Sequence, residues 1–190
     1  MDEAPIIARL DEGDVAGAAT EALRLYGQPI LGYLHSVARN EADAGEIFSM
    51  FCEDLWTGLP QFRRESSFRT WAYKLAWHAA MRFFKDPYRK RAQPLASEEF
   101  SRLAQAVRTT TAAHLRTEAK DKIARLRESL DPSEQTLLTL RIDRGMPWQE
   151  IAEIMSESGE RPAEAALRKR FERLKEKLRK LAQDEGLIPR

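Results

Sequence analysis

Apolar residues recur every three or four positions along most of the chain, the spacing that places them on one face of an α-helix. The strict alternation of apolar and polar residues that is typical of a half-buried strand is missing. Glycine, proline and asparagine interrupt the helical pattern, and helices are predicted between these interruptions, at about 3–11, 14–26, 28–39 and 42–57. The sequence therefore predicts an all-α fold.

A further helix is predicted to begin near Phe68 and to end before Pro87. Ser66 or Ser67 can cap its first turn, and a residue before proline avoids helical backbone. Its apolar residues fall on two opposite faces. One is an ordinary core stripe made by Phe68, Trp71, Ala72, Leu75, Ala79 and Phe83; the other carries Tyr73, Trp77, Ala80 and Phe84. The second face has two interpretations: a helix packed between two neighbours, or an aromatic surface that contacts a partner.

The remainder of the chain is interpreted as a linker and a second domain. Residues 92–124 have no strong apolar period, so they are predicted to separate two small helical domains, 1–91 and 125–190. The second domain opens with an acidic N-cap at Asp131, proline at the first helical position and Glu134 at the third, a variant of the capping box. Helices at about 132–142 and 147–155 follow, and then a longer basic helix with the apolar seam Leu167, Phe171, Leu174, Leu178 and Leu181.

A short helix, a turn and a longer basic helix form the arrangement of a helix-turn-helix, in which the last helix enters the major groove. Many three-helix bundles show the same periodicity, and a charged, coiled-coil-like helix that contacts protein is the alternative interpretation.

Charge changes sign along the chain, although the formal total is only +1. Residues 1–60 hold three basic side chains against eleven acidic ones, 62–91 hold nine against two, and 161–190 hold ten against five. This segregation predicts two separate surfaces for a polyanion. In 62–91 the cations alternate with aromatic rings. Unpaired nucleic acid favours such a pattern, because bases stack on rings while cations follow phosphates. A solvated basic face is the plainer interpretation.

Several classes of protein are not expected. The single cysteine, Cys52, provides neither an intramolecular disulfide nor a cysteine-based zinc site. The three histidines are isolated, and no nucleophile–base pair, metal-ligand cluster or glycine-rich phosphate loop is present, so no catalytic residue, metal or cofactor is predicted. Without an apolar run of about 18 residues or a secretory signal, the protein is expected to be soluble and cytoplasmic, with no membrane insertion.

The sequence FRRESSFRTWAYKLA at residues 62–76 is similar to the promoter-melting motif of bacterial sigma factors of the compact, extracytoplasmic-function type in the sigma-70 family. Residues 13–27 and 43–56 resemble the family's polymerase-binding region. Residues 130–155 resemble its fourth region, which reads the minus-thirty-five element. The resemblance covers roughly 13–91 and 125–182. It implies a non-enzymatic protein that binds core RNA polymerase and promoter DNA; members commonly also have an anti-sigma factor as an inhibitory partner.

The resemblance and the helix patterns together suggest three sets of site residues. Core polymerase binding is expected from Asp43, Glu46, Ile47, Phe48, Met50 and Phe51. Binding and melting of the minus-ten element is expected from Phe62, Arg63, Arg64, Ser66, Ser67, Arg69, Lys74, Trp77, His78 and Lys85. Binding of the minus-thirty-five element is expected from Arg168, Lys169, Arg170 and Arg173.

The chain departs from the family pattern at three places. Ser49 and Met50 stand where the family usually has glutamine followed by an acid. His78 stands where many members have asparagine near the pocket for a flipped base. Residues 156–165 form a longer turn than the family's, so individual base contacts can differ.

Two rival functions stay open. A helix-turn-helix transcriptional regulator with a separate helical sensing domain would explain residues 130–182 equally well, but it leaves the second aromatic stripe without a role. An adaptor that acts only through protein contacts would need neither basic surface.

Overall fold

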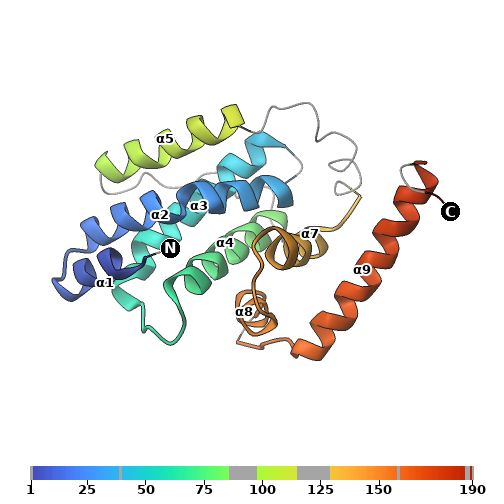
Figure 1. The fold of residues 1–190 in the computed structure, drawn as a ribbon. Coiled ribbons are helices and arrows are strands. Elements are labelled where there is room, and N and C mark those ends of the chain that lie inside the picture. Colours follow the sequence, from blue (N-terminus) through green and yellow to red (C-terminus); the bar gives the residue numbers. More distant parts are fainter. Residues whose placement is uncertain are drawn as a thin grey trace. The chain divides into compact units, whose positions relative to one another are not determined.

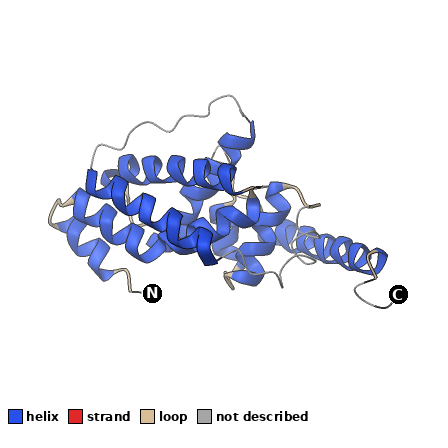
Figure 2. Cartoon of the chain, turned by 90° about the horizontal axis from the view of Figure 1, so that it is seen from above, coloured by secondary structure: helices blue, strands red, loops and turns tan. Residues whose placement is uncertain are grey.

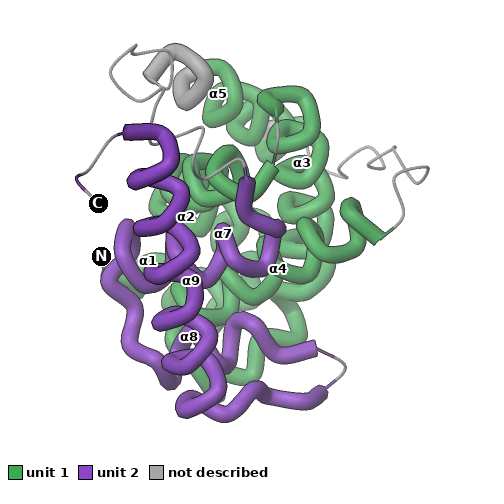
Figure 3. The backbone as a smooth tube through the Cα atoms, turned by 90° about the vertical axis from the view of Figure 1, so that its right-hand side faces the viewer, with its two compact units in different colours: residues 1–116 green, residues 117–190 purple. Residues whose placement is uncertain are grey.

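The computed structural model describes residues 2–38, 40–85, 98–114, 129–157, 159–186 and 189. The described residues form helices and connecting loops without a named strand, which confirms the all-α prediction (Figures 1 and 2). The chain divides into two compact units, residues 1–116 and 117–190 (Figure 3). Each unit has its own core of buried apolar residues.

The first unit is built around one long helix. Its elements are α1 (Ala4–Asp11), α2 (Val15–Val37), α3 (Glu41–Gly58), the short 3₁₀ helix η1 (Leu59–Gln61), α4 (Phe68–Lys85) and α5 (Glu98–His114). Helix α2 packs against α1, α3, α4 and α5. Neighbours on several sides of one helix bury apolar residues around much of its circumference, so α2 forms the centre of this core.

Helix α2 corrects the prediction of two helices at 14–26 and 28–39. The helix begins as expected, with the Asp14 carboxylate accepting a hydrogen bond from the Gly17 N–H at 2.8 Å. It then continues through Pro29 without a break. Proline inside a helix costs about 3 kcal/mol. The burial of Tyr26, Ile30 and other residues on both sides of Pro29 offsets that cost, which local sequence signals do not reveal.

Helix α4 begins at Phe68, as predicted, and Ser67 is its cap, since the Thr70 N–H donates to Ser67 Oγ at 3.1 Å. The prediction that Trp77 faces outward is wrong. Trp77 is 1% exposed and Tyr73 2%, because α4 packs against both α2 and α3. The helix packed between neighbours is therefore the correct interpretation. Trp71, assigned to the core stripe, is only half-buried.

Helix α5 changes the predicted domain boundary. Residues 98–114 fall in the predicted linker, yet they form a helix that packs against α2 and α3. Phe100 is fully buried with its ring centroid 5.3 Å from that of Trp56. A Cβ on Gly27 would lie 3.1 Å from Val107 Cγ2, so glycine lets the two helices approach. The first unit thus extends beyond residue 91. Residues 92–97 and 115–124 of the predicted linker lie outside the described residues.

The second unit contains α7 (Pro132–Leu138), the π-helical segment η3 (Thr139–Asp143), α8 (Trp148–Ile154) and α9 (Glu164–Asp184). The predicted capping box is confirmed: the Glu134 N–H donates to Asp131 Oδ1 at 2.8 Å, and the Asp131 N–H donates to Glu134 Oε2 at 3.0 Å. Buried apolar residues from all four elements form the core, among them Leu137, Leu140, Ile151, Ile154, Leu167, Phe171 and Leu174.

Candidate nucleic-acid interfaces

The loop before α4 places an aromatic ring at its base and cations at its tip. Phe62 is half-buried, with its ring centroid 5.3 Å from Phe68 and 5.0 Å from Trp71. Arg63 follows with 82% of its side chain exposed. Ser66 is half-buried and Ser67 is exposed, and the Ser67 hydroxyl is engaged as the cap of α4. The three-ring cluster anchors the loop, while its cations stay accessible to a polyanion.

Arg64 has a backbone conformation that few L residues adopt. Its φ is 59°, in the left-handed region, and its guanidinium forms an ion pair with Asp11 at the end of α1. The contact joins residues that are 53 positions apart. The tip of the loop is therefore attached to the N-terminal helix.

The end of the loop is attached to the same helix through Glu3. Its carboxylate accepts hydrogen bonds from the Phe68 N–H at 3.0 Å and the Arg69 N–H at 2.8 Å, the first two amides of α4. The Tyr26 hydroxyl donates to the same carboxylate at 2.6 Å. Burial, followed by the bond to Glu3, raises the pKa of Tyr26 well above its usual range. Sequence analysis did not identify Glu3, because no local signal connects residues so far apart.

One face of α4 carries most of its predicted DNA-binding residues. Lys74, His78 and Lys85 are separated by four and seven positions, which places them on one side of a helix. Lys85 is exposed, while Lys74 and His78 are half-buried, as is Arg69 near the start of the helix. The half-buried Trp71 borders this face, so Trp71 replaces Trp77 as its candidate aromatic residue.

Helix α3 separates the predicted polymerase-binding residues into two groups. Ile47, Phe48 and Phe51 are at most 1% exposed, so their prediction as contact residues is wrong. They face the core because α3 packs against α2 and α4. Asp43, Glu46 and Met50 are half-buried. Glu46 and Met50 are four positions apart and share the outer side of the helix, which leaves them as the candidate contact residues.

Asp43 has a local role as well. Its N–H donates to Asn40 Oδ1 at 2.8 Å, and its carboxylate accepts from Asn40 Nδ2 at 2.9 Å. Asn40 therefore caps α3, and the acid of Asp43 lies where the helix dipole favours a negative charge.

Ser49, one of the departures from the family pattern, lies beneath α5. Arg108 Nη1 donates to Ser49 Oγ at 3.4 Å, and a Cβ on Gly45 would lie only 2.9 Å from Arg108 Nη2. The small residues at 45 and 49 therefore make room for the arginine of α5. A longer side chain at residue 49 would compete for that space.

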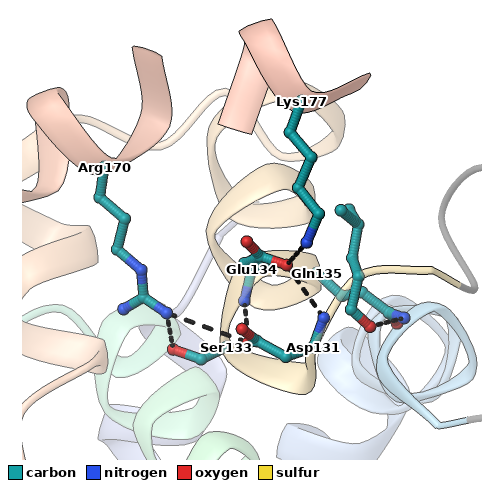
Figure 4. A network of polar contacts seen from close by, with 7 residues as sticks. Asp131, Ser133, Glu134, Gln135, Arg170 and Lys177 are labelled. Carbon is teal, nitrogen blue, oxygen red and sulfur yellow. Dashed lines mark hydrogen bonds and ion pairs between the residues drawn. The ribbon is translucent and has the colours of Figure 1, made fainter. Parts of the chain in front are cut away.

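Helix α9 uses one of its predicted DNA-binding residues, Arg170, and the neighbouring Lys177 in contacts within the unit (Figure 4). Arg170 Nη2 donates to Ser133 Oγ at 2.7 Å and lies 4.0 Å from the Asp131 carboxylate. Lys177 Nζ forms a 2.7 Å ion pair with Glu134. Both cations thus attach α9 to the first turn of α7. Arg170 therefore has a structural contact within the unit, and its role as a DNA contact stays a prediction.

The other three cations of the predicted set are exposed. The Arg168 guanidinium lies 5.5 Å from the Trp148 ring centre and 3.4 Å from the Glu164 carboxylate. Within the described part of the chain, the side chains of Lys169 and Arg173 make no hydrogen bond or ion pair. These two residues are the candidates for a DNA contact that needs no rearrangement.

The long turn before α9 is held to α8. Glu157 and Glu160 pair through two backbone hydrogen bonds of 3.0 and 2.8 Å. Arg161 Nη2 donates to the Gln149 carbonyl at 2.8 Å, and Arg161 Nη1 lies 3.8 Å from the Glu153 carboxylate. The T-shaped contact of Trp148 with Phe171, at 5.5 Å, packs α8 on α9 beyond the turn. Helix, turn and longer helix thus follow in the predicted order, while entry of α9 into a DNA groove stays a prediction.

The described residues contain no group of three or more His, Cys, Asp or Glu side chains that could hold a metal ion. In the same residues, no helix combines the length and apolar character needed to cross a membrane.

Two comparisons with known proteins find similarity to sigma factors. The family model described as Sigma-70 region 2 matches residues 22–92, which include most of α2 and all of α3, η1 and α4. RNA polymerase sigma factor YlaC of Bacillus subtilis (strain 168) is 27% identical over 165 residues, covering 86% of this chain and 94% of YlaC. The aligned stretch is longer than residues 1–116, so the similarity extends into both compact units.

Proposed function

Since this chain belongs to the sigma-70 family of bacterial RNA polymerase sigma factors, in the extracytoplasmic-function group, we propose that it is an alternative sigma factor. It binds core RNA polymerase, directs the enzyme to specific promoters and assists in opening the DNA. The observation that carries this proposal is the Sigma-70 region 2 match, which includes the cationic loop, its three-ring cluster and the basic face of α4.

Polymerase docking is assigned to the outer side of α3. Glu46 and Met50 present an acid and a flexible apolar side chain on the same face. Oε1 of Glu46 is shielded from solvent and has no hydrogen-bond partner among the described residues. The residue as a whole is half-buried, so the accessible part of its carboxylate gives the docking face a negative charge with which a basic side chain of the polymerase would pair.

Promoter recognition uses both units. Lys169 and Arg173 of α9 contact the minus-thirty-five element, where cations position the protein on phosphates or read base edges. The loop 62–67 and the exposed face of α4 hold the unpaired strand of the minus-ten element. Trp71 and Phe62 provide rings, and Lys74 and Lys85 provide charge. His78 borders the same face and is assigned to reading a flipped base.

Strand opening by this mechanism requires binding energy and no catalytic residue. Extruding a base costs a few kcal/mol, and stacking on an aromatic side chain returns about 1–3 kcal/mol per base. Cations beside the rings stabilise the displaced strand. The polymerase carries out the chemistry of RNA synthesis. An anti-sigma factor, common in the family, would regulate the protein but would not take part in strand opening.

Reconstitution tests the proposal directly. Purified protein is added to core RNA polymerase with a library of promoter fragments, and RNA synthesis from specific start sites is measured. The proposal requires transcription that depends on both proteins. A transcriptional regulator of the helix-turn-helix class would bind duplex DNA but would not cause core polymerase to start RNA synthesis at specific sites. That outcome would contradict the proposal.

We expect Met50→Asp to weaken binding to core polymerase by about 2 kcal/mol, roughly thirtyfold in affinity, because the substitution places a charge at an apolar contact. Fluorescence anisotropy of the labelled full chain, titrated with core polymerase, measures the effect. Met50→Leu is the matched control and should bind as the wild type does. Equal affinity of the Asp variant and the wild type would remove Met50 from the interface.

We expect Lys169→Ala and Arg173→Ala each to weaken promoter binding. A lost phosphate contact lowers affinity for all sequences and reduces the salt slope by about one; a lost base contact costs ~1–3 kcal/mol at one base pair. Binding is measured at several salt concentrations and with single base-pair changes. Lys180→Ala removes the same charge further along α9 and serves as the control. If both variants bind as this control does, α9 contacts something other than DNA.

A further inference from the structure

Helix α1 and its N-cap Glu3 lie outside the residues matched by the family model, yet they contact the proposed strand-opening loop and the first turn of α4 that follows it. At the loop's end, the Glu3 carboxylate accepts both the Phe68 and Arg69 amides. At the loop's tip, Asp11 pairs with Arg64. Glu3 precedes the helix and Asp11 is its last residue, so α1 spans the distance between the two contacts.

The contact at Glu3 is well defined by its geometry. Each carboxylate oxygen accepts one amide of α4, and Oε1 also accepts the Tyr26 hydroxyl at 2.6 Å. Tyr26 is buried in the centre of the unit and stacks on Phe68 at 5.9 Å. The Glu3 carboxylate is thus bound to the core through Tyr26 and to the first turn of α4 through the two amides. Phe68 in turn contacts Phe62, the first residue of the loop.

The contact at Asp11 supports a strained residue. Arg64 has a φ of 59°, and conformations of this kind persist where the surrounding structure holds them. The ion pair with Asp11 provides such support. It also directs the Arg64 side chain toward α1, while the neighbouring Arg63 stays exposed. The two arginines of the loop therefore have different tasks.

We propose that α1 positions the strand-opening loop, with Glu3 and Asp11 as positioning residues. The inference rests on the proposed function, because it assigns a role to α1 only if loop 62–67 holds unpaired DNA. Glu3 holds the first turn of α4, which begins after the Ser67 cap, and with it the relation of Phe62 to Trp71. Asp11 sets the conformation of the loop tip. Neither residue touches DNA; both hold the loop in position to capture a base as it leaves the duplex, a step that an already unpaired promoter does not require.

The test uses the full chain with core polymerase and a promoter that carries a fluorescent base analogue in the minus-ten element. Glu3→Gln replaces one carboxylate oxygen with an NH₂ group, which cannot accept from an amide. We expect it to slow opening of duplex promoter about tenfold. Glu12→Gln makes the same charge change at an exposed residue next to α1 and should open at the wild-type rate.

A promoter that is already unpaired over the minus-ten element separates positioning from general stability. On this template Glu3→Gln should bind and initiate as the wild type does, with unchanged affinity for core polymerase. The inference is overturned if Glu3→Gln opens duplex promoter at the wild-type rate. It is also overturned if the variant is impaired equally on both templates. Asp11→Asn is the second variant, and the Asp11 side chain is exposed, so the substitution should not disturb the core. We expect a smaller slowing confined to duplex promoter, and the wild-type rate would overturn the role of Asp11. Failure of the wild-type protein to open any promoter would instead contradict the proposed function.

Discussion

Replacement of Trp77 by alanine is expected to lower the free energy of unfolding of the first unit by about 3–5 kcal/mol. Trp77 is 1% exposed and is one of the largest fully buried side chains of the structure. Its removal leaves a cavity between α4 and its neighbours, which the packed helices can fill only in part. Denaturant unfolding of the full chain, followed by circular dichroism, measures the loss.

Two further variants sharpen this test. The Trp77 indole N–H is buried without a hydrogen-bond partner among the described residues, so Trp77→Phe should cost much less than Trp77→Ala. Trp71→Ala removes a half-buried ring, and its main expected effect is weaker strand opening. If Trp77→Ala is as stable as the wild type but fails to open the promoter, the interpretation of the second stripe as an aromatic surface that contacts a partner is restored.

Replacement of Phe100 by alanine is expected to cost about 3–5 kcal/mol and to release α5 from the first unit. Phe100 is fully buried and contacts Trp56 of α3. Ala104 and Val107, further along the same side of α5, are also buried. Loss of this anchor leaves α5 with a much smaller apolar contact. Hydrogen exchange of the α5 amides should therefore become faster than that of α2.

Gln105→Ala is the control for this variant, because Gln105 is exposed on the same helix. It should leave exchange and stability nearly unchanged. If Phe100→Ala has no effect on either, residues 98–114 behave as the linker predicted from the sequence. The experiment thus decides whether α5 is a working part of the first unit in solution.

A stable α5 has a consequence for polymerase binding. Arg108 reaches Ser49, so α5 covers the side of α3 next to the proposed docking face of Glu46 and Met50. Phe100→Ala should therefore expose the side of α3 that includes Trp56 and Ser49. The difference in polymerase affinity between this variant and the wild type would show whether α5 borders the interface.

The sequence by itself was sufficient to predict features that depend on a few neighbouring residues. The start of α4 after a serine cap, the capping box of Asp131 and Glu134, and the positions of α8 and α9 all agree with the structure, which selects Ser67 from the two candidate serines. The motif at residues 62–76 also indicated the family. Caps, prolines and helical periodicity act within one or two turns, so they can be recognised without knowledge of the fold.

Only the tertiary structure decided which faces of these helices are buried. Periodicity shows that α4 has two apolar faces, but it does not show how many neighbours the helix has. Helices α2 and α3 bury most of both faces, including Trp77, and leave Trp71 only half-buried. Packing likewise carries α2 through Pro29 and places α5 on the first unit. Glu3 and Asp11 meet the loop across 65 and 53 positions of sequence. Contacts at such separation depend on how the helices assemble, and no local pattern encodes them.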